Sequence, residues 1–254
     1  MINILVPMAG RSTFFDETVY QFPKVLVELN GKPMIEWVIN NLSSLSREKH
    51  FIFAVGERDC SKYYLDNTLR LLAEKSDVIR LKTETKGAAC SCLMAVEQID
   101  NDIPLIIANC DQILDVDLDQ VLSDFESRQL DAAVICFDSV HPKWSYSQID
   151  EEGWVVETAE KRPISRNAIA GFYYFHRGAD FVSAAFRAIR KDSSVEGIYY
   201  IAPILNELIL DGRKVGAVTI PNERYHSFYS PQKIEEFERM KKIADTDPVT
   251  ERVK

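Results

Sequence analysis

The chain opens with the stretch INILVPMAGRST, residues 2–13, and this stretch indicates the class of fold. Its apolar part, Ile2 to Met8, has the length and composition of a buried strand. The small and polar residues after it predict a loop at the carboxyl end of that strand. Backbone N–H groups in such a loop can approach phosphate oxygens, and Arg11 adds a positive charge. An ordinary surface turn could have the same composition, so this loop alone does not establish a phosphate site.

Apolar runs and helical stripes alternate along the first half of the chain. Strict alternation predicts parallel strands covered by helices, because right-handed crossovers bury both faces of the sheet. Further strands are expected at 25–29, 51–55, 78–81 and 105–108, and helices at 34–45, 59–74 and 87–99.

The pattern becomes mostly strand-like after residue 131. We predict one mixed α/β domain over residues 1–245, with a mostly parallel Rossmann-like sheet flanked by helices and an added, partly antiparallel sheet. Residues 1–130 are expected to bind a nucleotide, residues 131–230 an acceptor, and 246–254 form a polar tail. The later strands are expected at 132–137, 145–149, 154–158, 168–175 and 215–220, and the later helices at 179–189, 200–210 and 231–244.

Composition limits the partners. The formal net charge of −9 argues against a broad nucleic-acid surface, which would need a basic stripe. No apolar run approaches the roughly 18 residues that a membrane span requires, and the first residues lack the basic region of a signal peptide. Five scattered cysteines predict reduced thiols and a cytoplasmic protein. A homo-oligomer remains possible.

Two charged residues lie next to predicted strands: Asp111 at a strand end, where ligands gather in an α/β sheet, and Lys24 just before the strand expected at 25–29. Asp111 follows four apolar residues, and a carboxylate there could hold Mg²⁺ together with phosphates and water. Lys24 follows Phe22-Pro23 and could neutralise a phosphate. The alternatives are a helix-capping aspartate and a solvent-exposed lysine.

Taken in order, several segments resemble the sugar-phosphate nucleotidyltransferases, which are similar to NDP-sugar pyrophosphorylases and share the GT-A fold of the nucleotide-diphospho-sugar transferase type. The resemblance extends from residue 2 to about residue 237, and the ordered series is more specific than any single piece. The matching segments are LVPMAGR (5–11), FPK (22–24), LNGKPM (29–34), TKGAA (85–89), NCD (109–111), EK (160–161) and AGFY (170–173).

The resemblance implies that an acceptor phosphate attacks the α-phosphorus of a nucleoside triphosphate and that pyrophosphate leaves. The acceptor would be a phosphomonoester, most commonly a sugar 1-phosphate. By analogy, Asp111 holds Mg²⁺, Lys24 steadies the phosphates, and Lys161 receives the acceptor phosphate. The implied nucleotide-binding residues are Met8, Ala9, Gly10, Arg11, Ser12, Thr85, Gly87, Ala88 and Asn109, and the implied acceptor-binding residues are Glu160 and Gly171.

Aromatic residues supply two further candidates for the acceptor site. Trp144 lies in the cluster HPKWSY (141–146) and could stack on a sugar or on a cationic head group. Tyr200 lies near Glu196 in the second half of the chain. For both aromatic residues, packing within the added sheet is the alternative interpretation.

The sequence departs from the family pattern at two places. Phe14 stands where the family usually has an arginine that binds the leaving phosphates. His226-Ser227 stands where the family usually has a late metal-binding aspartate. Two alternatives therefore remain: a GT-A glycosyltransferase that uses Asp115-Val116-Asp117 as its metal motif, and a nucleotide- or sugar-binding relative without turnover.

Overall fold

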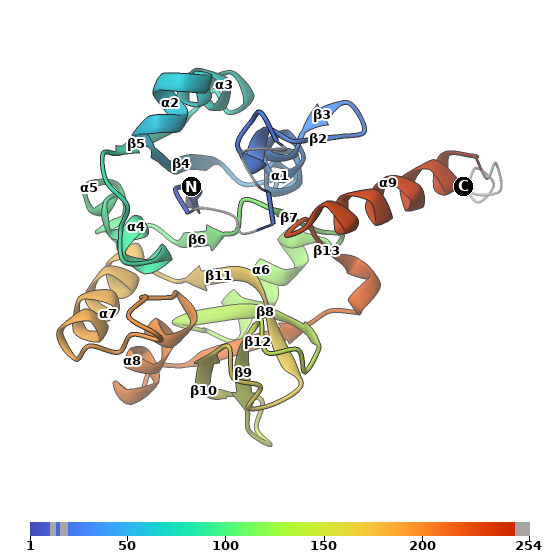
Figure 1. Ribbon diagram of the computed structural model, residues 1–254. Helices are drawn as coiled ribbons and strands as arrows, with labels where there is room; N and C mark the ends of the chain where they lie inside the picture. The colour runs from blue at the N-terminus through green and yellow to red at the C-terminus, as the bar shows by residue number, and fades with distance from the viewer. Residues whose placement is uncertain (11–13, 16–19, 247–254) are drawn as a thin grey trace.

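The computed structural model describes residues 1–10, 14–15 and 20–246, and Figure 1 shows the arrangement of their helices and strands. Within this part of the chain, the main sheet has nine strands. They are β1 (Ile2–Pro7), β4 (Lys49–Gly56), β5 (Ser76–Leu81), β6 (Leu105–Ala108), β8 (Ala132–Asp138), β9 (Ser145–Ile149), β10 (Val155–Glu160), β11 (Asn167–Phe175) and β12 (Val215–Thr219).

The first half of this sheet is parallel, with β1 between β4 and β6 and with β5 at the outer edge. Strand β11 runs antiparallel to β6 and to β8, and β8 pairs in parallel with β12. The hairpin β9–β10 joins the first half of β11. The predicted fold class is confirmed, although most of the added antiparallel strands extend the main sheet.

Two small antiparallel pairs lie outside the main sheet. They are β2 (Glu28–Leu29) with β3 (Lys32–Pro33), and β7 (Gln112–Leu114) with β13 (Tyr225–Ser227). The second pair brings the late segment of the chain beside Asp111, because the Phe228 N–H donates to the Asp111 carbonyl at 2.7 Å.

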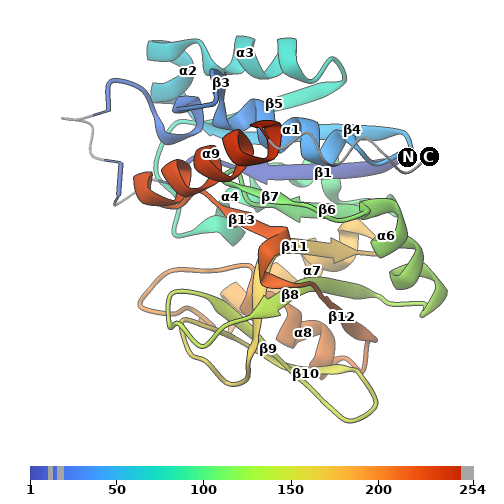
Figure 2. The same cartoon turned by 90° about the vertical axis from the view of Figure 1, so that its right-hand side faces the viewer.

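Helices cover both faces of the main sheet, as Figures 1 and 2 show. Alternate side chains of β1 point to opposite faces, so Ile4 and Val6 pack under α1, α3 and α6, whereas Leu5 packs under α4, α7 and α8. The helices are α1 (Met34–Ser43), α2 (Glu57–Tyr63), α3 (Leu65–Leu72), α4 (Ala88–Leu93), α5 (Val96–Ile99), α6 (Leu118–Ser127), α7 (Gly178–Arg190), α8 (Leu205–Leu210) and α9 (Pro231–Thr246), with short 3-10 turns η1 (Lys24–Leu26), η2 (Ala202–Ile204) and η3 (Asn222–Arg224).

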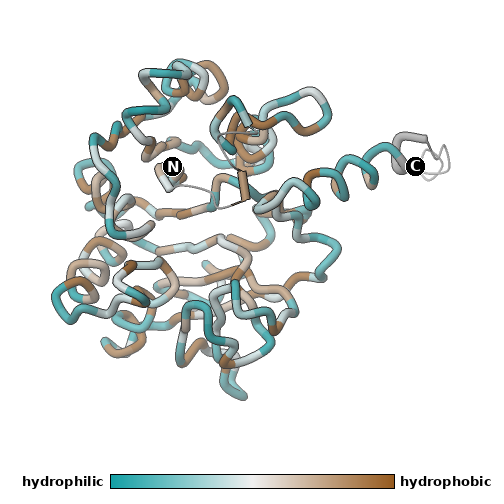
Figure 3. The backbone as a smooth tube through the Cα atoms, in the orientation of Figure 1, coloured by the Kyte–Doolittle hydropathy of each residue, from teal (hydrophilic) through white to brown (hydrophobic). Residues whose placement is uncertain are grey.

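Helix α9 projects from the body of the molecule in Figure 1 and is largely hydrophilic in Figure 3. Its first half is anchored by Ile234 and Phe237, which pack in a third apolar cluster with Phe15, Met34 and Phe228. Helix α9 therefore packs against Phe15, in the segment that follows β1. In the described residues, no helix is both long and apolar enough to cross a membrane.

Four predicted elements need correction. Residues 25–29 do not form one strand, because η1 precedes the two-residue strand β2. The helix expected at 59–74 is broken at Tyr64, whose φ of 53° is left-handed. The helix expected at 87–99 is interrupted between α4 and α5, and the one expected at 200–210 begins as η2 at Ala202. Apolar spacing continues across each break, so it did not reveal the change in backbone conformation.

Candidate active site

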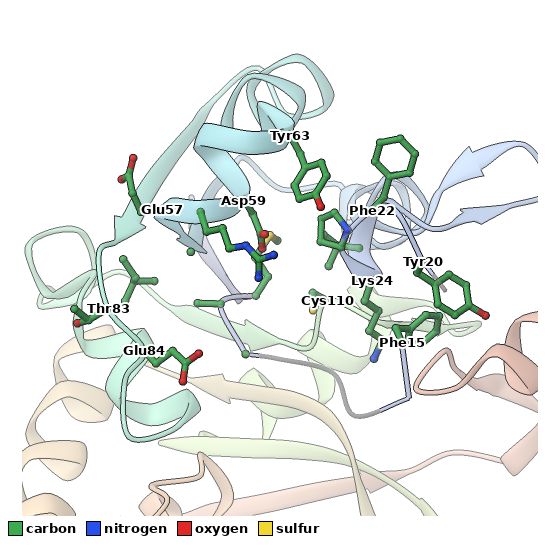
Figure 4. Close-up of a pocket in the computed structure, with 18 of the residues that line it drawn as sticks. Phe15, Tyr20, Phe22, Lys24, Glu57, Asp59, Tyr63, Thr83, Glu84 and Cys110 are labelled. Carbon is green, nitrogen blue, oxygen red and sulfur yellow. The ribbon is translucent and has the colours of Figure 1, made fainter. Parts of the chain in front are cut away.

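A cavity of about 570 Å³ opens at the carboxyl ends of the parallel strands. The segments that follow β1, β4, β5 and β6 all contribute to its lining, and Figure 4 shows their side chains around it. This is where open α/β sheets bind ligands. The lining includes Met8, Ala9 and Gly10 after β1, Gly56 to Asp59 after β4, Lys82 to Glu84 after β5, and Cys110 after β6.

An ion pair between Lys24 and Asp111 joins η1 to the end of β6. Each side chain is 17% exposed, so both charges are largely removed from bulk solvent yet accessible to a ligand. The Lys24 ammonium also lies 5.6 Å from the ring centroid of Phe15. Next to this pair, burial and the charge of Asp111 raise the pKa of Cys110 to about 12, so its thiol stays protonated at neutral pH. Lys24 thus lines the cavity, and Asp111 lies beside it as the partner of Lys24; Glu57, Arg58, Asp59, Lys82 and Glu84 are the other charged residues of the lining.

Gly171 packs against the segment that carries Asp111. It lies in β11 with a φ of +58°, and its carbonyl accepts hydrogen bonds from the Asn109 N–H at 3.0 Å and from Gln112 Nε2 at 2.9 Å. A Cβ atom at this position would lie 2.1 Å from Asn109 Nδ2. Glycine is therefore required both by the backbone conformation and by the close packing. These contacts fix the position of the Asp111 loop relative to β11.

A second group of predicted residues lies around Lys161, at the end of β10. Its ammonium is 3.3 Å from Glu196 Oε2 and 5.2 Å from the ring centroid of Tyr200. A hydrogen bond with Tyr200 is the main cause of the raised pKa of Lys161, which keeps the side chain charged. The backbone N–H of Lys161 donates to the Trp144 carbonyl at 3.0 Å. The structure thus places three of the residues named for the acceptor side together: Lys161, Tyr200 and the neighbouring Glu160. Trp144 meets this group only through its backbone carbonyl, and its ring packs against Phe137 and Tyr225.

Glu160 is a half-buried member of that group. Its carboxylate accepts a hydrogen bond from the Ser145 hydroxyl. Burial raises its pKa, while Ser145 and Lys161 oppose that rise. A desolvated carboxylate with a fixed neighbour is well suited to accept a hydrogen bond from a hydroxyl of a ligand.

Gly87 packs the segment 85–89 against the segment that contains Tyr199. The Lys86 carbonyl accepts from the Tyr199 N–H at 2.7 Å, and the Tyr199 carbonyl accepts from the Ala89 N–H at 3.1 Å. Between these two bonds, Gly87 has a φ of +117°, and a Cβ there would lie 2.4 Å from the Tyr199 oxygen. These distances describe packing between two backbone segments, and the contact of Gly87 with a base stays a prediction.

The predicted nucleotide residues therefore fall into three sets. Met8, Ala9 and Gly10 line the cavity together with Lys24. Thr85, Gly87, Ala88 and Asn109 are not among its lining residues, and the Thr85 hydroxyl instead bonds with Ser91 at 2.7 Å. Arg11 and Ser12 lie outside the described residues.

Sequence reasoning missed much of the aromatic rim of the cavity. The rings of Phe22 and Tyr63 have centroids 5.9 Å apart, and Tyr20 and Phe15 lie on the same side of the cavity as Phe22, next to Lys24 (Figure 4). An exposed aromatic residue beside the Pro-Lys pair was the only signal for this rim. Tyr63 could not be found in this way, because its position follows from where α2 ends.

Positions 14 and 227, where the sequence departs from the family pattern, are occupied by uncharged side chains. Phe14 lies edge-on to Tyr229 at 5.7 Å, and Ser227 pairs with Gln112 in the β7–β13 ladder. Within the described residues, no group of three or more His, Cys, Asp or Glu side chains could hold a metal ion by itself. Any cation at Asp111 would therefore depend on ligand oxygens as well.

The acidic pair proposed for a glycosyltransferase has structural roles instead. Asp117 caps α6 by accepting from the Gln120 N–H at 3.0 Å, and Asp115 pairs with Arg224 at 2.9 Å. Neither residue lines the cavity. The arrangement does not favour the glycosyltransferase alternative.

A mostly parallel sheet with a cavity and a lysine–aspartate pair at its carboxyl edge agrees with a nucleotidyltransferase. Residues 4–191 match the family model described as the MobA-like NTP transferase domain, and the chain belongs to this family.

Individual proteins agree with this assignment. The chain is 25% identical over 256 residues to the UTP–glucose-1-phosphate uridylyltransferase AglF of Haloferax volcanii. The match covers 98% of this chain and 100% of that relative. It is 22% identical to the bifunctional protein GlmU of Caldicellulosiruptor saccharolyticus, over 84% of this chain but only 48% of GlmU. It thus spans about half the length of that relative.

A solved structure supports the same fold. The nucleoside-diphosphate-sugar pyrophosphorylase from Vibrio cholerae RC9 superimposes with a TM-score of 0.80 at 25% sequence identity. The match covers 93% of this chain and 99% of that one. The expected relationship to NDP-sugar pyrophosphorylases is confirmed.

Proposed function

We propose that this nucleotidyltransferase joins a nucleoside triphosphate to a sugar 1-phosphate at the carboxyl edge of the sheet, with Mg²⁺. The observation that carries the proposal is the Lys24–Asp111 pair beside a cavity of about 570 Å³. Residues 1–130 would hold the nucleotide and residues 131–230 the acceptor. A cytoplasmic location remains a prediction from the sequence.

In this proposal, Lys24 turns from Asp111 towards the triphosphate, where its ammonium neutralises phosphate charge. Lys161 holds the acceptor phosphate, and Glu160 accepts a hydrogen bond from a sugar hydroxyl. A phosphate oxygen of the acceptor attacks the α-phosphorus, the bond between the α- and β-phosphates breaks, and pyrophosphate leaves with its electrons. Because the acceptor is already anionic, no general base is needed. Catalysis would come from positioning and charge stabilisation.

The donors around Asp111 are compatible with Mg²⁺. This ion usually keeps several waters and takes one or two carboxylates together with substrate phosphates, so a single protein carboxylate is sufficient. Asp111 would supply that carboxylate, and the ion would stabilise charge on the phosphates. Nucleotidyltransferases of this kind generally use a divalent metal.

Pyrophosphate release from UTP and glucose 1-phosphate is the first assay, because the names of the relatives point to this substrate pair. The other triphosphates follow with the same acceptor. We expect Asp111→Asn and Lys24→Met each to lower kcat by about 10²-fold or more, the size of the loss when a charge-stabilising group is removed. Lys32→Met is the matched control, because Lys32 is 52% exposed and, in the part of the chain that the structure describes, forms its ion pair with Glu36 on the surface.

Unchanged turnover in Asp111→Asn would contradict the role of this carboxylate. Full activity after removal of divalent ions with EDTA would contradict the magnesium proposal. Absence of pyrophosphate release with all triphosphates and a panel of sugar 1-phosphates would contradict the proposed reaction itself.

A further inference from the structure

Phe15 lies beside the ammonium of Lys24 in the strand-end cavity, and the reaction described above gives it no role. Its side chain lines the cavity, and its ring centroid lies 5.6 Å from Lys24 Nζ. Figure 4 shows the two side chains next to each other. In the part of the chain that the structure describes, the ammonium therefore has two partners, the carboxylate of Asp111 and this ring.

The two partners of Lys24 differ in how they compete with a phosphate. A carboxylate carries a full negative charge, so Asp111 must release the ammonium before Lys24 can neutralise a phosphate. An aromatic ring attracts a cation through its quadrupole and has no net charge. Phe15 can therefore stay in contact with the ammonium while phosphate oxygens bind to it.

Burial increases the importance of this ring. The side chain of Lys24 is only 17% exposed, so an ammonium that leaves its counter-ion there lacks part of its hydration. Cation–π attraction is stronger at such desolvated sites than at exposed ones. The Phe15 ring thus stabilises the ammonium inside the cavity when Asp111 takes up a cation, as proposed above.

The position of the Phe15 ring is fixed by packing. Phe15 is 6% exposed and belongs to the third apolar cluster, which anchors α9. Tyr20 packs against the same ring, with centroids 5.0 Å apart. Phe228, from the same cluster, donates its N–H to the Asp111 carbonyl at 2.7 Å. The cluster therefore holds one neighbour of Lys24 and one of Asp111, and a neighbour locked by packing keeps a charged group in a defined place.

We infer, on the basis of the proposed function, that Phe15 is a positioning residue: its ring holds the ammonium of Lys24 in the cavity and directs it to the triphosphate. The electrostatic character of the ring, and not only its volume, then contributes to triphosphate binding. A saturated apolar side chain of similar size would fill the cluster but would leave the ammonium without this partner.

Stepwise fluorination of Phe15 tests the electrostatic role, because fluorine weakens the quadrupole of the ring with little change in its size. Phe15 is replaced by mono-, di- and trifluorinated phenylalanine. ATP, CTP, GTP, UTP and dTTP are first titrated with Mg²⁺ by calorimetry, and the one that binds most tightly is used throughout. We expect its dissociation constant to rise with each fluorine, by about 5-fold or more over the series, the value of a cation–π contact.

Steady-state kinetics and a saturated variant extend this test. kcat/KM for the triphosphate should fall by the same factor over the series, whereas KM for glucose 1-phosphate should stay unchanged, because the acceptor phosphate binds elsewhere. Phe15→Leu should weaken triphosphate binding at least as much as the trifluorinated variant.

Phe237 is the matched control. It is 3% exposed in the same cluster, and the ammonium of Lys241 lies 5.8 Å from its ring centroid, but it does not line the strand-end cavity. Fluorination of Phe237 should leave the dissociation constant of the triphosphate unchanged. Urea denaturation of both series measures any disturbance of the cluster itself. An equal rise of the dissociation constant in the two series would assign the effect to packing and overturn the inference.

A double-mutant cycle with Lys24→Met isolates the contact between the two side chains. When methionine replaces Lys24, the ring has no ammonium to hold, so fluorination of Phe15 should no longer change the dissociation constant. A gradient that persists in Lys24→Met would overturn the inference. Equal dissociation constants across the Phe15 series in the otherwise wild-type protein would overturn it as well.

Binding and turnover separate this inference from the proposed function. A gradient in triphosphate affinity without pyrophosphate release would support the inference and contradict the proposed reaction. Pyrophosphate release without any gradient in affinity or in kcat/KM would support the reaction and overturn the inference. No binding of any of the triphosphates would overturn the inference.

Discussion

Replacing Gly87 by alanine tests whether glycine is required for the segment 85–89 to pack against the segment around Tyr199. The backbone of Gly87, with φ +117° and ψ 174°, lies in a region that is essentially restricted to glycine. A Cβ atom there would lie 2.4 Å from the oxygen and 2.8 Å from the nitrogen of Tyr199. Since these are backbone atoms, the clash cannot be relieved by a side-chain rotation, and the segment around Tyr199 must move.

The expected loss has two parts. Forcing alanine into this conformation costs about 1–3 kcal/mol. Moving Tyr199 breaks its hydrogen bonds with Lys86 and Ala89, each contributing about 1 kcal/mol. We therefore expect Gly87→Ala to lower the free energy of unfolding by about 3–5 kcal/mol. For a chain of this length, that loss lowers Tm by about 6 °C or more.

Urea denaturation and thermal unfolding of the variant would measure this loss, with Gly212→Ala as the control. Gly212 also has a positive φ of +70°, but a Cβ there would meet nothing within 4 Å. Gly212→Ala should lower the free energy of unfolding by only about 1–2 kcal/mol, the cost of placing a residue with a Cβ atom in the left-handed conformation. If Gly87→Ala cost no more than Gly212→Ala, the reasoning that links Gly87 to the Tyr199 segment would be refuted.

Two further outcomes concern the cluster that anchors α9. Phe237 is 3% exposed, so Phe237→Ala should lower the free energy of unfolding by about 3–5 kcal/mol in urea denaturation, whereas Met240→Ala, at an exposed site, should change it by less than about 0.5 kcal/mol. A similar loss in both variants would contradict this difference in burial. Burial lowers the pKa of His226, so the unfolded chain binds a proton near pH 6.5 that the folded chain resists, and stability should fall as the pH is lowered through that range. His226→Gln should lose less stability than the wild-type protein between pH 7.5 and pH 5.5, and an equal loss would assign the pH dependence to other groups.

The positions of the strands along the chain were largely predictable, because each strand is a separate apolar run. Residues 105–108 and 145–149 were placed with the observed bounds. The failure at 59–74 lies where one residue changes backbone conformation without interrupting the apolar spacing. Tyr64 ends α2 in the left-handed region, and the same residue precedes α3. No glycine or proline marked this break, so the sequence pattern could not reveal it.

The site was predictable to the extent that its residues directly follow strands. Asp111 and the residues after β1 fall into this group, since the carboxyl ends of parallel strands meet at one edge. Lys24 was instead predicted from the segment Phe22-Pro23-Lys24, and it lies in η1. The rim formed by Phe22 and Tyr63 depends on the length and direction of α2, which periodicity does not specify. The pairing of Lys161 with Glu196 could not be foreseen either. It depends on a two-residue turn at Glu196-Gly197, in which both residues have positive φ.

The two departures from the family pattern, Phe14 and Ser227, are connected through Tyr229 in this fold. Phe14 contacts Tyr229, and Ser227 lies two residues before Tyr229 on the same segment. Relative to the family pattern, position 14 lacks a positive charge and position 227 lacks a negative one. Losing either charge alone would change the electrostatic balance of a partly buried site, whereas losing both leaves their sum unchanged. The remaining Lys24–Asp111 pair is itself balanced, so these replacements are compatible with the function proposed above, in which Lys24, Lys161 and a divalent cation would carry the charge stabilisation.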